Sequence, residues 1–137
     1  MAIRERSTPQ AWGKKTHIYT GLRKYYDYLF REYPQWFPTL TDLVEVSATL
    51  GIAHDEQKDL AKEKDRLAAV LNLDSVAFYV LMSLRFPEKT PEERLEELEK
   101  FAEYGVSRLY EEMKQNGEVG FLQYLKPALE ACGSEAK

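Results

Sequence analysis

Residues 90–113, TPEERLEELEKFAEYGVSRLYEEM, carry the clearest helix signal in this chain. Thr90, Pro91 and Glu93 form a capping box with proline at the first helical position, which marks a helix N-terminus. The apolar residues after it recur at helical spacing; they are Leu98, Phe101, Ala102, Gly105, Val106, Leu109 and Met113. Glycine inside a helix costs ~1 kcal/mol, so Gly105 beside Ala102 predicts close approach of another helix. This helix is expected to run to about Gln115.

Three further helices are predicted before residue 72. The stretch 21–37, GLRKYYDYLFREYPQWF, has an apolar stripe at helical spacing until Pro34 ends it. That stripe consists of Leu22, Tyr25, Tyr26, Leu29, Phe30 and Tyr33. Thr39 and Asp42 approximate a capping box for a second helix, which Gly51 is expected to close in the left-handed conformation. A third helix is expected from about Asp55 to Leu71.

The remaining segments complete an all-α prediction. Residues 75–86, SVAFYVLMSLRF, are apolar nearly all round and are expected to be the central helix. A last helix is expected through 120–132, GFLQYLKPALEAC. No segment alternates polar and apolar residues for long, so no strand is predicted. We therefore expect a single-domain bundle of five or six helices at residues 19–133, preceded by a flexible basic N-terminal segment at 1–18.

The charge of the chain is uneven. The whole sequence has a formal net charge of −4, but residues 1–33 hold seven basic and three acidic side chains, a net +4, which leaves −8 for the rest. A basic segment on an acidic body could contact phosphates, acidic lipid or its own acidic helices. The candidate contacts to nucleic acid or a partner are Lys14, Lys15, Tyr19, Arg23, Lys24, Tyr28 and Arg31. Tyr19 and Tyr28 belong to this set because they fall outside the apolar stripe.

No pattern of residues predicts catalysis, a metal or a cofactor. The chain has two histidines and one cysteine, Cys132, and neither a nucleophile motif nor a phosphate-binding glycine loop occurs. Glu92, Glu96, Glu99 and Glu103 are spaced three or four residues apart, and we expect them on a solvated face or a face that docks a basic partner. No apolar run is long enough for a membrane span and no signal peptide is present, so a cytoplasmic protein with no membrane partner is expected. Two asparagines and abundant Glu, Lys and Arg favour a thermophilic source.

Residues 43–60, LVEVSATLGIAHDEQKDL, could form a helix-turn-helix. Leu50, Gly51 and Ile52 would make its turn. However, the second helix would present Asp55, Glu56, Asp59 and Glu63 to an anionic groove. Two packed helices joined at a glycine remain the simpler interpretation.

With this order of elements, the chain resembles the dnd system-associated proteins, small helical proteins found beside DNA phosphorothioation genes. The similarity covers about residues 25–113. It is carried by EYPQWF (32–37), TLTDLVEVSATLG (39–51), DSVAFYVLMSL (74–84) and FAEYGVSRLYEEM (101–113), where Glu103, Tyr104 and Gly105 match. The segment AHDEQKDL (53–60) is acidic where that family tends to be basic. The resemblance implies an accessory role near prokaryotic DNA modification or defence and brings no catalytic residues.

Three functional hypotheses follow. The first is a non-catalytic interaction protein that acts with a protein partner or as a homo-oligomer, in a setting of DNA modification, defence or a mobile element. The second is direct DNA binding by the basic N-terminal region or by a degenerate helix-turn-helix at 43–60. The third, least favoured, is an enzyme with a site near His54.

Overall fold

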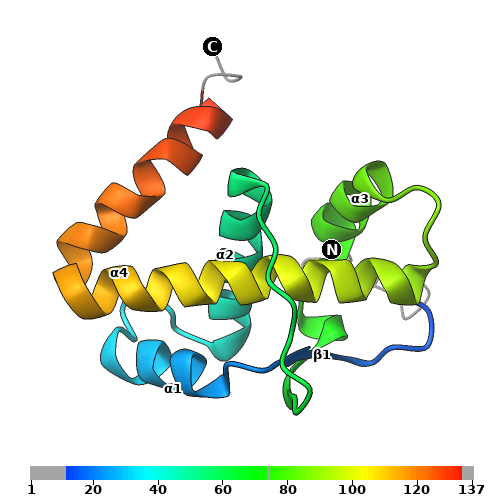
Figure 1. Cartoon of the computed structure of the whole chain (residues 1–137), viewed down its shortest axis with the longest axis horizontal. Helices are drawn as coiled ribbons and strands as arrows, with labels where there is room; N and C mark the ends of the chain where they lie inside the picture. Colours follow the sequence, from blue (N-terminus) through cyan, green and yellow to red (C-terminus); the bar gives the residue numbers. More distant parts are fainter. Residues whose placement is uncertain (1–11, 74, 134–137) are drawn as a thin grey trace.

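A computed structural model of the chain describes residues 12–73 and 75–133, with side chains described at 12–70, 72–73 and 76–117. Within these residues the elements are β1 (His17–Thr20), α1 (Arg23–Glu32), α2 (Leu40–His54), β2 (Asp65–Ala69), the 3-10 helix η3 (Val70–Asn72), α3 (Ser75–Arg85) and α4 (Pro91–Gly133). The predicted all-α bundle of five or six helices is therefore wrong, because four α-helices are joined by a two-stranded antiparallel sheet. In Figure 1, α4 spans the molecule, α1 and β1 lie along one side of it, and α3 stands near its N-terminal end.

The helix predicted from residue 91 is confirmed as α4, which supplies the centre of the core. The backbone N–H of Thr90 donates to Glu93 Oε1 at 2.9 Å, and the Glu93 N–H donates to Thr90 Oγ1 at 3.2 Å. The helix end predicted at about Gln115 falls beside a kink, because Gly117 has non-helical φ 64° and ψ −152°, and a further helical segment, predicted at 120–132, follows to Gly133. Figure 1 shows that the part beyond the kink leads away from the body.

The crossing of α2 over α4 depends on two glycines. A Cβ atom on Gly105 would overlap the carbonyl oxygen of Ser47, and one on Gly51 would overlap the carbonyl oxygen of Phe101. The close approach predicted at Gly105 is confirmed. The left-handed cap predicted at Gly51 is wrong, because α2 continues to His54 and Asp55 takes that conformation, with φ 56°. Glycine is needed at residue 51 for the contact between helices rather than for a turn.

The third helix predicted at 55–71 is wrong. After Asp55 the chain crosses α4 as an extended segment, which Figure 1 shows in front of the helix. The Lys58 N–H donates to the Lys100 carbonyl at 3.0 Å, and the Gln57 amide donates to the Glu97 carbonyl and carboxylate at 3.1 and 2.8 Å. These bonds to α4 replace the bonds of a helix, so tertiary contacts override the helical propensity of the segment. Without a second helix there, residues 43–60 do not form a helix-turn-helix.

Strand β2 follows this segment and pairs with β1. His17 and Ile18 lie opposite Ala69 and Ala68, whereas Tyr19 and Thr20 lie opposite Arg66 and Asp65. Leu67 is therefore an extra residue in β2, a bulge that directs its side chain into the core. The domain boundary predicted at residue 18 falls within β1, and Trp12 and Ile18 are fully buried. Residues 1–11 lie outside the described part of the chain.

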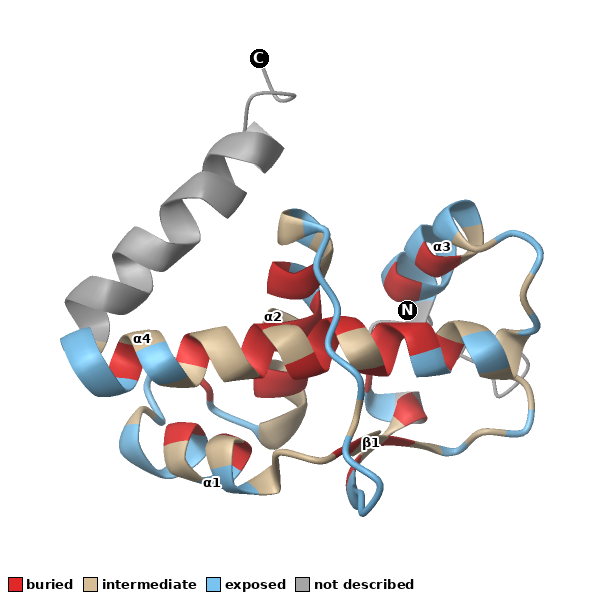
Figure 2. Cartoon of the chain, in the orientation of Figure 1, coloured by how far each residue is buried: buried red, intermediate tan, exposed pale blue. Residues whose placement is uncertain are grey.

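The core lies along α4 rather than around residues 75–86. Figure 2 shows the buried residues concentrated on α4, α2 and β1, while much of α3 is exposed. The buried apolar side chains in the described part of α4 are Leu95, Leu98, Phe101, Ala102, Val106, Leu109 and Met113, which is the predicted stripe extended by Leu95. Phe78 and Met82 of α3 are buried, but Val76, Val80 and Leu84 are exposed. The expectation that α3 is the central helix is wrong.

The α2–α4 crossing makes a prediction about stability. Gly→Ala in an ordinary helix stabilises by ~1 kcal/mol, whereas at Gly51 or Gly105 the added methyl meets backbone atoms that cannot move away. We expect Gly105→Ala and Gly51→Ala each to lower the free energy of unfolding by about 2 kcal/mol or more, measured by urea denaturation. Gln115→Ala, an exposed position on the same helix, is the control and should change it little. A stabilised Gly105→Ala protein would contradict the close crossing.

Candidate functional site

The helix α3 presents an apolar surface to solvent. Its inward side buries Phe78 and Met82, and its outward side, here called the outer face of α3, consists of Val76, Ala77, Val80, Leu81 and Leu84. Leu84 is 74 % exposed, Val80 48 % and Val76 43 %. These positions lie on the side of the helix opposite Phe78 and Met82. Contiguous apolar surface of this kind marks interaction sites in natural proteins.

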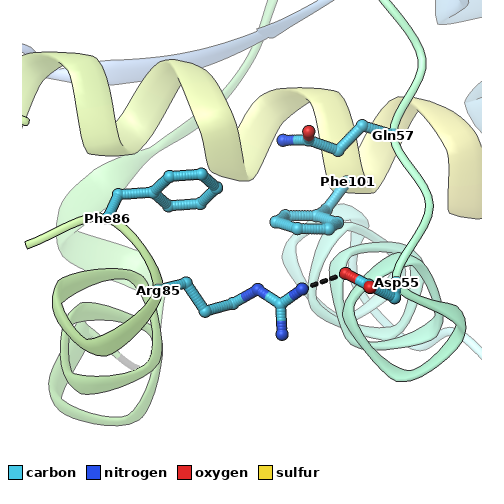
Figure 3. A pocket seen from close by; sticks show the side chains of 5 residues that line it. All are labelled: Asp55, Gln57, Arg85, Phe86 and Phe101. Carbon is cyan, nitrogen blue, oxygen red and sulfur yellow. Dashed lines mark hydrogen bonds and ion pairs between the residues drawn. The ribbon is translucent and has the colours of Figure 1, made fainter.

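A hollow of about 340 Å³ lies beside α3, and we call it the aromatic hollow. Figure 3 shows its five lining side chains: Asp55, Gln57, Arg85, Phe86 and Phe101. The rings of Phe86 and Phe101 have centroids 6.4 Å apart and form an apolar wall. The Arg85 guanidinium pairs with the Asp55 carboxylate and lies 5.3 Å from the centroid of the Phe101 ring.

Three elements position the aromatic hollow. The left-handed conformation of Asp55 ends α2 and turns the chain toward α4, where the Gln57 amide is held by Glu97. Arg85 is the last residue of α3 and follows Leu84 of the outer face directly. The aromatic hollow and the outer face of α3 are therefore neighbours. The arrangement can accept an apolar side chain against the two rings and a polar group at the Arg85–Asp55 pair.

The seven contact residues predicted from sequence do not come together in one site. Lys14, Lys15 and Tyr19 line a hollow of about 410 Å³ beside Glu92. Arg23 and Lys24 line another of about 400 Å³. Tyr28 and Arg31 lie further along α1, and the Arg31 guanidinium is 5.8 Å from the Tyr28 ring centroid.

Several of these cations already have carboxylate partners. Lys15 Nζ lies 3.3 Å from Glu96, Arg23 Nε 3.0 Å from Asp27, and Arg31 Nε 3.0 Å from Glu32. Each of these ion pairs neutralises, within the protein, a cation that the sequence predicted would contact nucleic acid or a partner. The positive charge of the N-terminal region is thus balanced in part by the acidic residues of the same protein.

A cluster of tyrosines with one lysine joins α1 to α4, and we call it the tyrosine–lysine cluster. The rings of Tyr25 and Tyr110 stack at 4.0 Å, and Tyr28 meets Tyr110 edge-on at 5.2 Å. Lys114 Nζ lies 5.5 and 5.3 Å from the centroids of Tyr28 and Tyr110 and 3.0 Å from the Tyr110 hydroxyl. Tyr110 and Lys114 were not predicted from the sequence, although their spacing of four residues on a predicted helix places them on one face.

Glutamates of α4 accept hydrogen bonds from β1 and from the residues on either side of it. Backbone N–H groups of Lys14, Tyr19 and Gly21 donate to Glu92, Glu99 and Glu103 at 2.9, 2.8 and 2.8 Å. The Thr20 hydroxyl also donates to Glu103, at 2.7 Å. The expected solvated face is therefore wrong for Glu99 and Glu103, which are buried. These carboxylates satisfy the backbone of a strand, a structural role that requires no catalysis.

Burial changes the protonation of these two carboxyl groups. Burial raises the pKa of Glu99 to about 7, opposed by the Tyr19 N–H and by the charges of Lys15 and Lys64. Burial also raises the pKa of Glu103, opposed by its bonds from Thr20 and Gly21. Glu99 therefore titrates near neutral pH inside the fold.

Comparisons with known proteins give no match: no family model, curated protein or solved structure is similar to this chain. The likeness to dnd system-associated proteins thus stays a prediction. Over the described residues, no group of three or more His, Cys, Asp or Glu side chains is placed to hold a metal ion. Over the same residues, every helix is too short or too polar to cross a bilayer.

Glu99 makes stability depend on pH. Its pKa is higher in the folded protein than the ordinary 4.5, so folding favours the protonated form. The stabilisation is complete below the unfolded pKa and is lost as pH rises through about 7. At ~1.4 kcal/mol per pKa unit, the free energy of unfolding falls by at most about 3 kcal/mol over this pH range. We expect the urea midpoint of Glu99→Gln to equal that of the natural chain at pH 5 and to be higher than it at pH 8. The control is Glu111→Gln, on the exposed side of α4, whose midpoint should equal that of the natural chain at both pH values. Equal urea midpoints at pH 8 would contradict a raised pKa.

Proposed function

We propose that this protein is a non-catalytic interaction protein that binds another protein through the outer face of α3. The observation that supports this most directly is the exposure of Val76, Val80 and Leu84 on one side of a helix whose other side is anchored by Phe78 and Met82. Burying apolar surface stabilises by about 25 cal/mol per Å², and this surface is available for burial. A protein partner can supply the matching apolar side chains.

The aromatic hollow supports the same proposal. Interfaces concentrate their binding energy in a few anchor side chains that fill pockets, and the Phe86 and Phe101 rings line a hollow that also includes Arg85, the last residue of α3. The Arg85–Asp55 pair at its rim offers a donor and an acceptor to polar groups of the partner. An amphipathic helix laid along α3, with one side chain in the hollow, fits both features.

The biological process in which we propose that this binding takes part is based on the resemblance to the dnd system-associated proteins. A small helical protein similar to them fits an accessory role in DNA modification, in defence or in a mobile element. The glutamates of α4 are occupied by the backbone of β1, which fits a protein that assembles with others rather than one that catalyses a reaction.

Crosslinking tests the proposed binding face. A photoreactive phenylalanine analogue at Val80 should capture a protein in extracts of the native host, and Leu84→Glu should remove the crosslink by placing a charge in the interface. The analogue at Phe30, an apolar residue of α1 that is 38 % exposed, is the control. If residues 30 and 80 capture the same proteins equally, or residue 80 captures none, the outer face of α3 is not the binding site.

A second candidate function is contact with nucleic acid along the N-terminal region. Aromatic rings next to cations are typical of single-strand binding surfaces, and the tyrosine–lysine cluster places Lys114 and Arg31 against Tyr28. Lys14 and Lys24 are exposed on the same N-terminal segment. The carboxylate partners of Lys15, Arg23 and Arg31 are the observation against it.

Salt dependence tests this second function. If the N-terminal cations bind phosphate, changing Lys14, Lys15, Arg23 and Lys24 to Ala should weaken binding to a labelled DNA. It should also lower the slope of log affinity against log salt by about one for each phosphate that is no longer neutralised. Arg108→Ala, a cation of α4 that pairs with Glu111, should leave both unchanged. Absent or salt-insensitive binding in a gel-shift titration excludes the N-terminal region as a DNA-binding surface.

A further inference from the structure

The outer face of α3 has a composition that suits contact with itself. At about 100° per residue, positions 76, 77, 80, 81 and 84 cover an arc of about 140° around the helix, and none of them is charged. A two-fold contact brings the same patch of two protomers together, so the patch must be complementary to itself. A charged residue at the centre of the patch would face its own copy, and one elsewhere would face an apolar residue, so either would oppose the contact, whereas a stripe of Val, Ala and Leu does not.

We propose that the outer face of α3 pairs with the same face of a second copy of this chain, the two helices running antiparallel. The pairing rests on the proposed function and names the partner. Centred on Val80, it places Leu84 of one protomer opposite Val76 and Ala77 of the other, and Val80 opposite Val80. The most protruding side chain, Leu84, thus meets smaller ones, which is how facing helices interdigitate.

The size of the face sets the strength of this dimer. α3 has 11 residues, so it is about 16 Å long, and its outer face can bury only part of the ~800 Å² per partner that a standard interface buries. The dimer is therefore weak and forms reversibly with concentration. Arg85 and the aromatic hollow lie at the margin of the contact and remain open to a further ligand or protein.

Residues 1–11 are the competing occupant within the same chain. Trp12, the first described residue, meets the Tyr79 ring of α3 edge-on at 6.3 Å, so the preceding segment starts beside this helix. Its eleven residues reach about 36 Å when extended. However, MAIRERSTPQA contains only two large apolar residues, Met1 and Ile3, together with Arg4, Glu5 and Arg6. A second copy offers more apolar surface to the outer face of α3 than this segment does.

Sedimentation of the full chain, from low micromolar to near-millimolar concentration, tests the dimer. We expect the average mass to rise toward twice that of one chain, and Val80→Glu or Leu84→Glu to weaken the association by about tenfold or more. Phe30→Glu should associate like the natural chain, and circular dichroism should show that all variants are folded. A monomer at every concentration overturns the proposal. A chain that dimerises only when residues 1–11 are removed also overturns it, because it shows that this segment covers α3.

Disulfide trapping tests the antiparallel geometry. On a Cys132→Ser background, Val80→Cys should form a covalent dimer on oxidation at least several times faster than Leu84→Cys, although Leu84 is the more exposed residue. Val76→Cys mixed with Leu84→Cys should form the mixed dimer. Faster trapping at residue 84 than at residue 80 contradicts the geometry. A monomeric chain that still crosslinks to another protein at residue 80 removes this proposal and leaves the proposed function standing.

Discussion

The contact of α2 with α4, backbone against backbone, is the constraint on which the rest of the structure depends. Gly51 meets the carbonyl of Phe101 and Gly105 meets the carbonyl of Ser47, so the two helices approach closely at two points one turn or more apart. Side chains on either side of the crossing, such as Leu43, Leu50 and Leu109, are then buried together. Because α2 continues through Gly51 to His54, the chain leaves it beyond the crossing. The connection to β2 must then pass back over α4.

Two different elements pack on α4, which is why it carries both apolar and acidic buried residues. One side of α4 packs on α2, and another side faces β1, a strand with only one partner strand. The Tyr19 N–H of β1 needs an acceptor, and Glu99 supplies it, while Glu92 and Glu103 accept from Lys14 and Gly21 on either side of the strand. The raised pKa of Glu99 is the consequence of placing a carboxylate there. The helix therefore anchors β1 and its flanking residues through carboxylate side chains.

The features that were predicted correctly from the sequence are those set by residues close together in the chain. The features that were missed depend on pairing between segments far apart in the sequence. The capping boxes at Thr39 and Thr90 and the helices they begin are correct, because caps and apolar spacing act within a few residues. The strand pair was missed, because HIYT and DRLAA are short and only their mutual pairing defines them. The segment 55–64 has helix-forming residues but is held by α4. For the candidate site, residues 75–86 were recognised as unusually apolar, but only the packing shows which side faces out.

The sequence of α3 contains more apolar residues than the fold buries, and the excess forms its exposed side. Phe78 and Met82 anchor the helix against the core, so polar residues at Val80 and Leu84 would serve the fold equally well and would avoid the exposed apolar surface. A helix designed only to be stable would be amphipathic, as α1 is with its exposed Arg, Lys and Asp side chains. Apolar residues on both sides of α3 are what the proposed interface would use. If the proposed interface is correct, stability and binding depend on opposite sides of one helix, and a change on its outer side alters assembly without altering the fold.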